Sequence, residues 1–368
     1  MDTIRPFITG SGLWKPANTI SNDELVHSYN AWVGQNLALF GDKPPFSNSE
    51  FIEKASGIKS RYVIEKDGIL DTNRMRPSLT ERPDDDISLQ AEMAIEAAKD
   101  ALCAANKLPN QIDAVIVSSS YTQRPYPAIA IEVQHALGIE GFAFDMQVAC
   151  SSGTFGLHRA YEMVKAGTAN SVLVISPELT SPQVNFTDRD SHFIFGDVAT
   201  AMVVENSKAI TSPLHTFEMI SVRAATQFSN NIRSNFGYTA RACDTDPFSP
   251  QALFHQNGRK VFKEVCPMAA DHLENHVASN GLKTSDIKRW WLHQANINMN
   301  QLIIRRLLGK NADQLTAPII LDQFANIASA GSLVAFNLYH QDMQPNDLGV
   351  ICSFGAGYSI GSLLLKKI

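Results

Sequence analysis

The chain of 368 residues is long enough for two packed domains or one large one, and its 44% hydrophobic and 18% charged residues indicate a folded protein. The net charge of −6 excludes the strongly basic surface of a non-specific nucleic-acid binder, and no apolar run approaches the roughly 18 residues of a membrane span. Residues 1–6 lack the pattern of a secretion signal, and the five scattered cysteines form no C-x-x-C pair. We therefore expect a cytoplasmic protein with reduced thiols and with no nucleic-acid or membrane partner.

Helical and strand-like segments alternate along the chain. Apolar residues at helical spacing predict helices at residues 88–105, 152–166 and 259–278. Short, apolar, β-branched runs predict buried strands at residues 114–117, 171–175, 201–204, 349–352 and 362–365. This alternation indicates an α/β protein whose sheets are covered by helices on both faces.

Three segments interrupt this alternation. Residues 41–50 and 76–86 are polar and rich in proline and are predicted loops, and residues 226–252 are predicted to be irregular. The change from one set of strands to the next places a boundary between two halves near residue 209.

The segment 142–156 carries the strongest chemical signal. It predicts a strand that ends at Cys150, followed by a sharp turn into the helix 152–166. A cysteine in that position faces the unpaired N–H groups and the positive end of the helix dipole, which favour the nucleophilic thiolate. Free cysteines are also common core residues, so the segment alone leaves both interpretations of Cys150 open.

Two later segments place polar side chains where strands or loops end. His293 follows the apolar run 290–292, and Asn326 precedes a helix start of small residues. Singly, His293 is also compatible with a structural role and Asn326 with a helix cap. A nucleophilic cysteine with remote histidine and asparagine partners is a recognised catalytic set. The small residues of 353–361 predict a turn whose backbone N–H groups can approach a ligand closely.

Taken together, these segments resemble the β-ketoacyl-[acyl-carrier-protein] synthase III family of thiolase-fold condensing enzymes. The likeness covers nearly the whole chain. It rests on motifs in the family's order, namely Gly57-Ile58-Lys59-Ser60-Arg61, Ala149-Cys150, Ile194-Phe195-Gly196-Asp197, His293-Gln294-Ala295-Asn296, Asn326 and Phe354-Gly355-Ala356-Gly357. Residues 51–61 and 190–197, with long loops at 28–50 and 70–86, resemble the medium-chain subgroup, which takes a primer such as octanoyl-CoA and forms β-ketodecanoyl-carrier protein.

The resemblance implies a homodimer of chains with two pseudo-duplicated αβαβα halves, residues 1–208 with Cys150 and residues 209–368 with His293 and Asn326. It implies that Cys150 takes an acyl group from acyl-CoA, and that malonyl-acyl carrier protein then loses CO2 and attacks the acyl-cysteine in fatty acid biosynthesis. The side chains of His293 and Asn326 suit the stabilisation of the enolate oxygen. The backbone N–H groups of Cys150 and Ala356 would hold the oxyanion of the acyl group.

The family also implies substrate-binding residues. Phe51 stands where members commonly have the tryptophan that stacks on the adenine of CoA, and Arg189 matches the opposite face. Tyr126 falls where an aromatic residue of the partner subunit caps the acyl pocket. Phe262, on the predicted helix 259–278, is expected to contact the substrate.

The expected contacts with the carrier protein differ from the usual pattern. Ala55 and Asn298 replace arginines that help to bind CoA or the carrier protein in typical members. Docking is therefore expected to use the residues Gln294, Asn298, Lys263, Arg305 and Arg306, although lysine and arginine at such positions are equally compatible with a solvated helix surface.

Other enzymes of this fold would leave different traces. A biosynthetic thiolase needs a second cysteine where Ser353 stands, and Cys352, one residue away, faces the other side of its strand. A hydroxymethylglutaryl-CoA synthase needs a catalytic glutamate ahead of Cys150, for which no convincing match is present. An inactive subunit would have lost one of the three site residues. An acyltransferase that moves the acyl group to an alcohol or amine uses the same three residues and remains the alternative.

His272 and His276 are four residues apart on the predicted helix 259–278, a spacing that suits a metal ion. No third ligand accompanies them, so we interpret both as surface residues of the helix and predict no metal site. No G-x-G-x-x-G segment follows a strand and no Walker-type loop is present, so no cofactor is predicted.

Overall fold

The computed structural model describes residues 4–211, 216–235, 237, 242–244, 246, 249–311 and 313–368. Its centre is a sheet of nine strands in the order β11-β12-β13-β8-β1-β7-β6-β4-β5. The strands of the first half are β1 (Pro6–Trp14), β4 (Ala114–Ser118), β5 (Phe142–Met146), β6 (Ser171–Glu178) and β7 (Val198–Asn206). Those of the second half are β8 (Phe217–Ser229), β11 (Ile287–Leu292), β12 (Leu348–Gly355) and β13 (Gly357–Lys367).

The two halves repeat one arrangement of strands. In the first half, β1 and β6 lie antiparallel to β7, and β4 lies parallel to β6. In the second half, β8 and β12 lie antiparallel to β13, and β11 lies parallel to β12. The strands β1, β7, β6 and β4 therefore correspond to β8, β13, β12 and β11, while β5 adds an outer strand parallel to β4. Among the described residues, two pairs between β1 and β8 join the half-sheets, Phe7 with Glu218 and Ile8 with Phe217.

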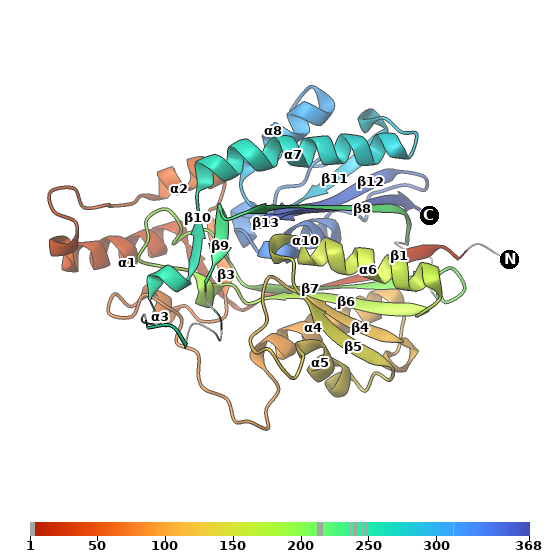
Figure 1. The fold of residues 1–368 in the computed structure, drawn as a ribbon, viewed down its shortest axis with the longest axis horizontal. Coiled ribbons are helices and arrows are strands. Elements are labelled where there is room, and N and C mark those ends of the chain that lie inside the picture. The colour runs from red at the N-terminus through yellow and green to blue at the C-terminus, as the bar shows by residue number, and fades with distance from the viewer. Residues whose placement is uncertain are drawn as a thin grey trace.

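Helices cover both faces of each half-sheet, which gives five layers (Figure 1). The helices of these layers are α4 (Leu89–Ala105), α5 (Ile129–Leu137), α6 (Ser152–Ala166), α7 (Gly258–Ser279), α8 (Ile297–Leu308) and α10 (Gly331–Leu338). In Figure 1, α7 and α8 lie outside the second half, α4 and α5 lie outside the first, and α6 and α10 lie between the two. A buried apolar cluster surrounds α6 and α10 and draws side chains from both halves. The predicted α/β class with αβαβα layers is confirmed.

The predicted helices match α4, α6 and α7 to within one residue at each end. The hydroxyl of Ser88 accepts a hydrogen bond from the Ala91 N–H and so caps the start of α4, as the serine before an apolar helix suggests. All the predicted strands are present and most are longer than their apolar runs. The boundary predicted near residue 209 falls between β7 and β8, and the division of the chain into residues 1–208 and 209–368 stays a prediction.

The other helices and strands stand outside the nine-stranded sheet and the helices that cover it. They are β2 (Asn18–Ser21), α1 (Asn22–Gln35), α2 (Ser49–Ser56), β3 (Ser60–Val63), α3 (Asp67–Leu70), β9 (Ile232–Ser234), β10 (Phe254–Gln256) and α9 (Leu321–Phe324). Of the predicted loops, residues 76–86 form no helix or strand, and residues 41–50 do so only where α2 begins. The segment predicted to be irregular contains the end of β8 and all of β9, beside residues that lie outside those described.

Two predictions about local structure are wrong. The strand expected to end at Cys150 stops at Met146, because Ala149 has a φ of 45° and the cysteine lies on a one-turn 3-10 helix. His272 and His276 are buried rather than exposed, because α7 packs against the sheet and Ser362 on β13 hydrogen-bonds to both imidazole rings, at 2.9 and 2.7 Å.

Among the described residues, no helix is both long and apolar enough to cross a membrane. Within the same part of the chain, no group of three or more His, Cys, Asp or Glu side chains is placed to hold a metal ion.

Candidate active site

One cavity takes its lining from both halves of the molecule. Its volume is about 1020 Å³, and Cys150 from the first half and His293 and Asn326 from the second all line it. Three side chains that are far apart in the sequence therefore face a common space.

Cys150 lies on the turn Ala149–Ser151, directly before α6. Its side chain rests against the end of β12, so that a Cβ atom on Gly355 would lie 2.5 Å from the Cβ and 3.0 Å from the sulfur of Cys150. The backbone N–H groups of Ala356 and of Cys150 itself lie near the sulfur and act to lower the pKa of the thiol. These are the two N–H groups that the sequence suggested as an oxyanion hole, and that role stays a prediction.

The ionisation of Cys150 differs from the expectation. Burial, and after it the negative charge of Glu178, raise the pKa of the Cys150 thiol to about 12, although the two backbone N–H groups act in the opposite direction. The loss of water around the sulfur thus outweighs the helix N-terminus. Burial therefore acts against the thiolate form that the helix N-terminus favours.

His293 follows β11, as the sequence suggested, and its backbone N–H donates to the Cys352 carbonyl at 2.8 Å. Its ring lies edge-on to that of Phe354, with the ring centroids 5.3 Å apart. Burial lowers the pKa of His293 to about 4, opposed by a hydrogen bond with the Ala328 backbone. The imidazole is therefore neutral at pH 7. Its Nδ1 atom is buried and has no hydrogen-bond partner among the described residues.

Asn326 is fixed through both its backbone and its side chain. Its N–H donates to the Ile194 carbonyl at 2.9 Å, and the Gly196 N–H donates to the Asn326 carbonyl at 3.2 Å. Its side-chain Oδ1 accepts from the Ala328 N–H at 3.0 Å. Because the amide oxygen is engaged in this way, the amide NH2 group is left as the donor toward the cavity.

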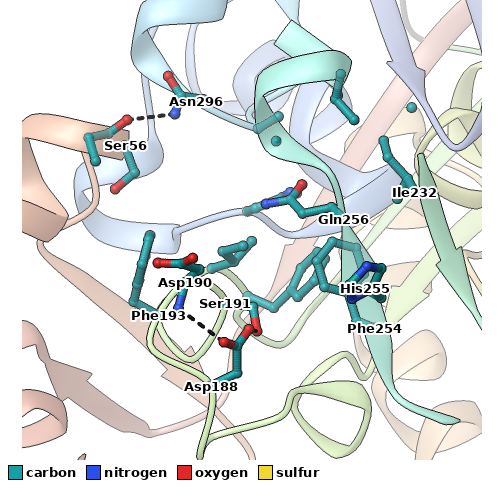
Figure 2. A pocket seen from close by; sticks show the side chains of 18 of the residues that line it. Ser56, Asp188, Asp190, Ser191, Phe193, Ile232, Phe254, His255, Gln256 and Asn296 are labelled. Carbon is teal, nitrogen blue, oxygen red and sulfur yellow. Dashed lines mark hydrogen bonds between the residues drawn. The ribbon is translucent and has the colours of Figure 1, made fainter. Parts of the chain in front are cut away.

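Figure 2 shows the outer part of the cavity from close by. Asp188, Asp190 and Phe193 lie on one side, and Ile232 of β9 and Phe254 of β10 lie on the other. The sequence did not indicate the β9–β10 pair, because strands of three residues are too short to show a period of two.

Phe51, which lines the cavity, and Arg189, which does not, lie against each other. The guanidinium carbon of Arg189 is 4.4 Å from the centroid of the Phe51 ring. The Nε–H of Arg189 also donates to the Phe46 carbonyl at 2.9 Å. The two residues that the family resemblance places on opposite faces of an adenine are thus in direct contact in this structure.

The other two residues expected to bind substrate occupy different places. Phe262 lines the cavity from α7. Tyr126, between β4 and α5, is 81% exposed and does not line the cavity of this single chain. A role for Tyr126 therefore depends on a second copy of the chain.

Of the residues expected to bind a carrier protein, four are exposed to solvent and one is buried. Asn298, Lys263, Arg305 and Arg306 are exposed on α7 and α8, and Arg306 is ion-paired with Asp271 on α7. Their role in docking stays a prediction.

Gln294 is a correction to that set. It is completely buried, because its amide NH2 donates to the carbonyls of Leu292 and Pro318, at 2.9 and 3.1 Å, and its Oε1 accepts from the Ile320 N–H at 3.0 Å. Its side chain shapes the interior and offers no surface to a partner.

Sequence reasoning missed Glu178 and Ser329, which lie buried beneath the cavity. Ser329 donates to the Glu178 carboxylate through both its N–H, at 3.2 Å, and its hydroxyl. An acidic residue at the carboxyl end of a buried apolar strand is the signal that would have identified Glu178. Cys352, by contrast, lies in the apolar core of the second half and does not line the cavity, which agrees with its predicted position on the other side of β12.

The chain matches two models of one family. Residues 144–222 match 3-oxoacyl-[acyl-carrier-protein (ACP)] synthase III, and residues 277–367 match the C-terminal part of the same enzyme. A β-ketodecanoyl-[acyl-carrier-protein] synthase of Pseudomonas aeruginosa is 52% identical over 87% of this chain and 91% of its own length. A β-ketoacyl-[acyl-carrier-protein] synthase III of Erythrobacter litoralis is 28% identical over 99% of both chains.

Solved structures share the fold. The 3-oxoacyl-[acyl-carrier-protein] synthase III of Aquifex aeolicus superposes with a TM-score of 0.77 at 23% identity, covering 99% of both chains. The priming β-ketosynthase of the R1128 polyketide pathway gives a TM-score of 0.78 at 23% identity, covering 98% of this chain and 96% of its own. At 23% identity, the similarity to these structures shows the thiolase-like fold alone. The relative that is 52% identical over 87% of this chain shows the family. The chain belongs to the 3-oxoacyl-[acyl-carrier-protein] synthase III family.

Proposed function

We propose that this chain joins an acyl-CoA primer to malonyl-acyl carrier protein by decarboxylative condensation in fatty acid biosynthesis, with Cys150 as the nucleophile. The convergence of Cys150, His293 and Asn326 on one cavity carries the proposal. Similarity to a β-ketodecanoyl-forming relative favours a medium-chain primer such as octanoyl-CoA. Apolar side chains of the lining, among them Ile232 and Phe254, suit an alkyl chain.

In the first half-reaction, the sulfur of Cys150 forms a bond with the carbonyl carbon of acyl-CoA and the bond to the CoA sulfur breaks. The thiol proton leaves with the CoA sulfur, so the step is balanced without a cofactor. The backbone N–H groups of Cys150 and Ala356, which act on the pKa of the thiol, are the donors that we propose for the oxyanion formed beside the sulfur.

In the second half-reaction, the malonyl thioester loses CO2 and becomes an enolate that attacks the acyl carbon. The Cys150 thiolate leaves and takes up one proton. The neutral imidazole of His293 and the free amide NH2 of Asn326 stabilise the enolate oxygen without protonating it. Such a donor is worth about 2.7–4 kcal/mol of barrier in other enzymes.

The proposal includes a homodimer in the cytoplasm. β5 forms the edge of the nine-stranded sheet on the side of the first half, opposite β11. Phe142 on β5 is 41% exposed and Ile131 on the neighbouring α5 is 46% exposed. An edge strand bordered by apolar side chains is suited to pairing with the same strand of a second copy. The exposed Tyr126, close in sequence to α5, would then be available to the partner's cavity.

The central test replaces the nucleophile. We expect Cys150→Ser to abolish acyl transfer from octanoyl-CoA, measured by mass spectrometry of the intact protein, because a serine hydroxyl is a far weaker nucleophile than a cysteine sulfur. Cys103→Ser is the control, because Cys103 is exposed on α4. A stable acyl adduct on any residue of the Cys150→Ser protein would contradict the mechanism.

The choice of primer needs a separate measurement. With malonyl-acyl carrier protein as the second substrate, we expect kcat/KM for octanoyl-CoA to exceed the values for acetyl-CoA and butyryl-CoA. A clear preference for acetyl-CoA would overturn the medium-chain assignment and leave the condensation reaction intact. Transfer of the acyl group to an alcohol or amine with no reaction on the carrier protein would replace the proposed function by the alternative.

A further inference from the structure

Each half of the molecule contributes one tight turn of the same shape. The turn 149–151 precedes α6 and the turn 328–330 precedes α10. The first residues of these turns have φ values of 45° and 43°. Within the repeat, Ser329 is therefore the counterpart of Cys150.

Different groups lie against the two turns. The end of β12 brings the backbone of Gly355 against Cys150 and leaves no room for a side chain. The corresponding strand, β6, ends with the side chain of Glu178, which lies against Ser329. The last residue of β12 is thus a glycine packed against the Cys150 turn, whereas the last residue of β6 is a glutamate whose carboxylate contacts the Ser329 turn.

Glu178 is completely buried and is held by hydrogen-bond donors. Ser120 donates to it through its N–H at 2.8 Å and its hydroxyl at 2.5 Å, and Ser329 donates through its N–H at 3.2 Å and its hydroxyl. Within the described part of the chain, no Lys, Arg or His side chain forms an ion pair with it. The charge of this buried carboxylate is stabilised by hydrogen bonds from Ser120 and from Ser329. These hydrogen bonds fix the position of the Ser329 turn relative to the segment that contains Ser120.

The Ser329 turn lies against both donors of the second half-reaction. The Ala328 N–H donates to the amide oxygen of Asn326 at 3.0 Å, and the Ala328 backbone lies close enough to the His293 ring to raise its pKa against the effect of burial. Glu178 itself does not line the cavity. Any effect of the carboxylate on the orientation of these two side chains must therefore pass through the turn.

We propose that Glu178 is a positioning residue for the second half-reaction: by anchoring Ser329 it orients the amide of Asn326 and the imidazole of His293 for decarboxylation. This inference rests on the proposed function. It assigns Glu178 no contact with either substrate.

The same carboxylate acts on the nucleophile in the opposite sense. Its negative charge contributes to the raised pKa of the Cys150 thiol. Removal of that charge makes the thiol easier to ionise, so the first half-reaction should not suffer from its loss. A residue that merely supports the fold would affect both half-reactions alike.

The test is Glu178→Gln, measured on the full-length protein in each half-reaction separately. Oε1 of Glu178 accepts from the Ser120 N–H and from both donors of Ser329, and Oε2 accepts from the Ser120 hydroxyl. Glutamine keeps the size of the side chain but removes its charge, so that the hydrogen bonds from Ser329 lose their charge assistance. We expect kcat for decarboxylation of malonyl-acyl carrier protein to fall roughly 10- to 100-fold, the size of effect expected from misplaced catalytic groups. We expect its KM to change less than about threefold, and acylation of Cys150 by octanoyl-CoA to be as fast as in the unaltered protein or faster.

Glu205→Gln is the matched control. Glu205 is equally buried in the same sheet, accepts hydrogen bonds from Thr9 and Ser171, and is ion-paired with Lys107 at 2.6 Å. It does not line the cavity. We expect this change to lower thermal stability and to leave the ratio of the two half-reactions unaltered.

The outcomes are separable. If the unaltered protein performs neither half-reaction, the proposed function fails. If it performs both and Glu178→Gln slows both equally, or slows neither, the positioning role of Glu178 is overturned and the function stands. If Glu178→Gln does not fold, Ser329→Ala decides, because it removes one donor and keeps the carboxylate. Selective loss of decarboxylation in Ser329→Ala supports the inference, and equal loss or no loss overturns it.

Discussion

Gly355 shows how far one missing side chain determines the position of the nucleophile. A Cβ atom there would lie 2.5 Å from the Cβ of Cys150, a distance that real Cβ atoms do not tolerate. The sulfur therefore owes its place, beside the Ala356 N–H, to the absence of that atom.

We expect Gly355→Ala to reduce the rate of Cys150 acylation roughly 100-fold, because displacement of a reacting atom by about 1 Å has this effect in other enzymes. The measurement is single-turnover acylation by octanoyl-CoA, followed by mass spectrometry. Gly34→Ala on α1 is the control, because a Cβ atom there meets no neighbour within 4 Å. Unchanged acylation in Gly355→Ala would show that the turn 149–151 moves without cost.

At the scale of single residues, the sequence predicted the identities in the site better than their electrostatics. Cys150, His293 and Asn326 were found from their places at the ends of strands and helices. The raised pKa of Cys150 was not foreseen, because it depends on burial and on Glu178, which lies on a different strand. Burial of Gln294 was missed for the same reason, since the motif that contains it says nothing of what packs over it.

On helix α7, two buried histidines hydrogen-bond to the sheet beneath the helix. His272 and His276 both hydrogen-bond to Ser362, and the hydroxyl of Ser221 lies 2.9 Å from the Nε2 of His276. Burial is the main cause that lowers the pKa of each imidazole to about 4, with the charge of Arg223 contributing to both. Both histidines are therefore neutral in the folded protein near pH 7.

These two pKa values predict the pH dependence of stability. The unfolded chain binds protons at histidine near pH 6.5, whereas the folded chain does so near pH 4. Between these values the unfolded state holds more protons, so the contribution of His272 and His276 to the free energy of unfolding falls as the pH falls from about 6.5 to about 4.

The measurement is the free energy of unfolding by urea between pH 7 and pH 5. We expect a smaller decrease for the double variant His272→Gln/His276→Gln than for the unaltered chain. An identical slope for the two proteins would mean that these imidazoles do not gain protons on unfolding.

The elements themselves were largely readable from the sequence because their signals are local. Helices α4, α6 and α7 follow apolar spacing over four or more turns, and the buried strands follow continuous β-branched runs. The pair β9–β10 was missed, since each strand has three residues and is stabilised by packing at the cavity opening. The position of Cys150 in a turn rather than at a strand end depends on one positive φ, which no periodicity reveals.

On the scale of the whole molecule, the repeat explains why the site lies where it does. Corresponding turns from the two halves meet beneath one cavity, so neither half contains a complete site. The layering was foreseen from the alternation of elements and from the family resemblance. The contact of Glu178 with the second half was not, because nothing in the sequence pairs two distant buried residues.

The proposed dimer can be tested at β5, the edge strand of the first half. We expect Phe142→Lys to shift the protein from a dimer toward a monomer in sedimentation or light-scattering measurements, because a charge on β5 opposes burial of that edge. Leu39→Lys is the control, since Leu39 is 70% exposed and lies on the 3-10 turn Leu37–Leu39, outside the sheet. A monomeric unaltered chain that retains full activity would contradict both the dimer and a role for Tyr126.

In this structure, one face of the Phe51 ring is already covered by the guanidinium of Arg189. A flat nucleotide base arriving there must exchange one stacking partner for another, so only the difference between the two stackings remains as net affinity. Under the proposed function, a low net affinity for the adenine base suits an enzyme whose first product is free CoA.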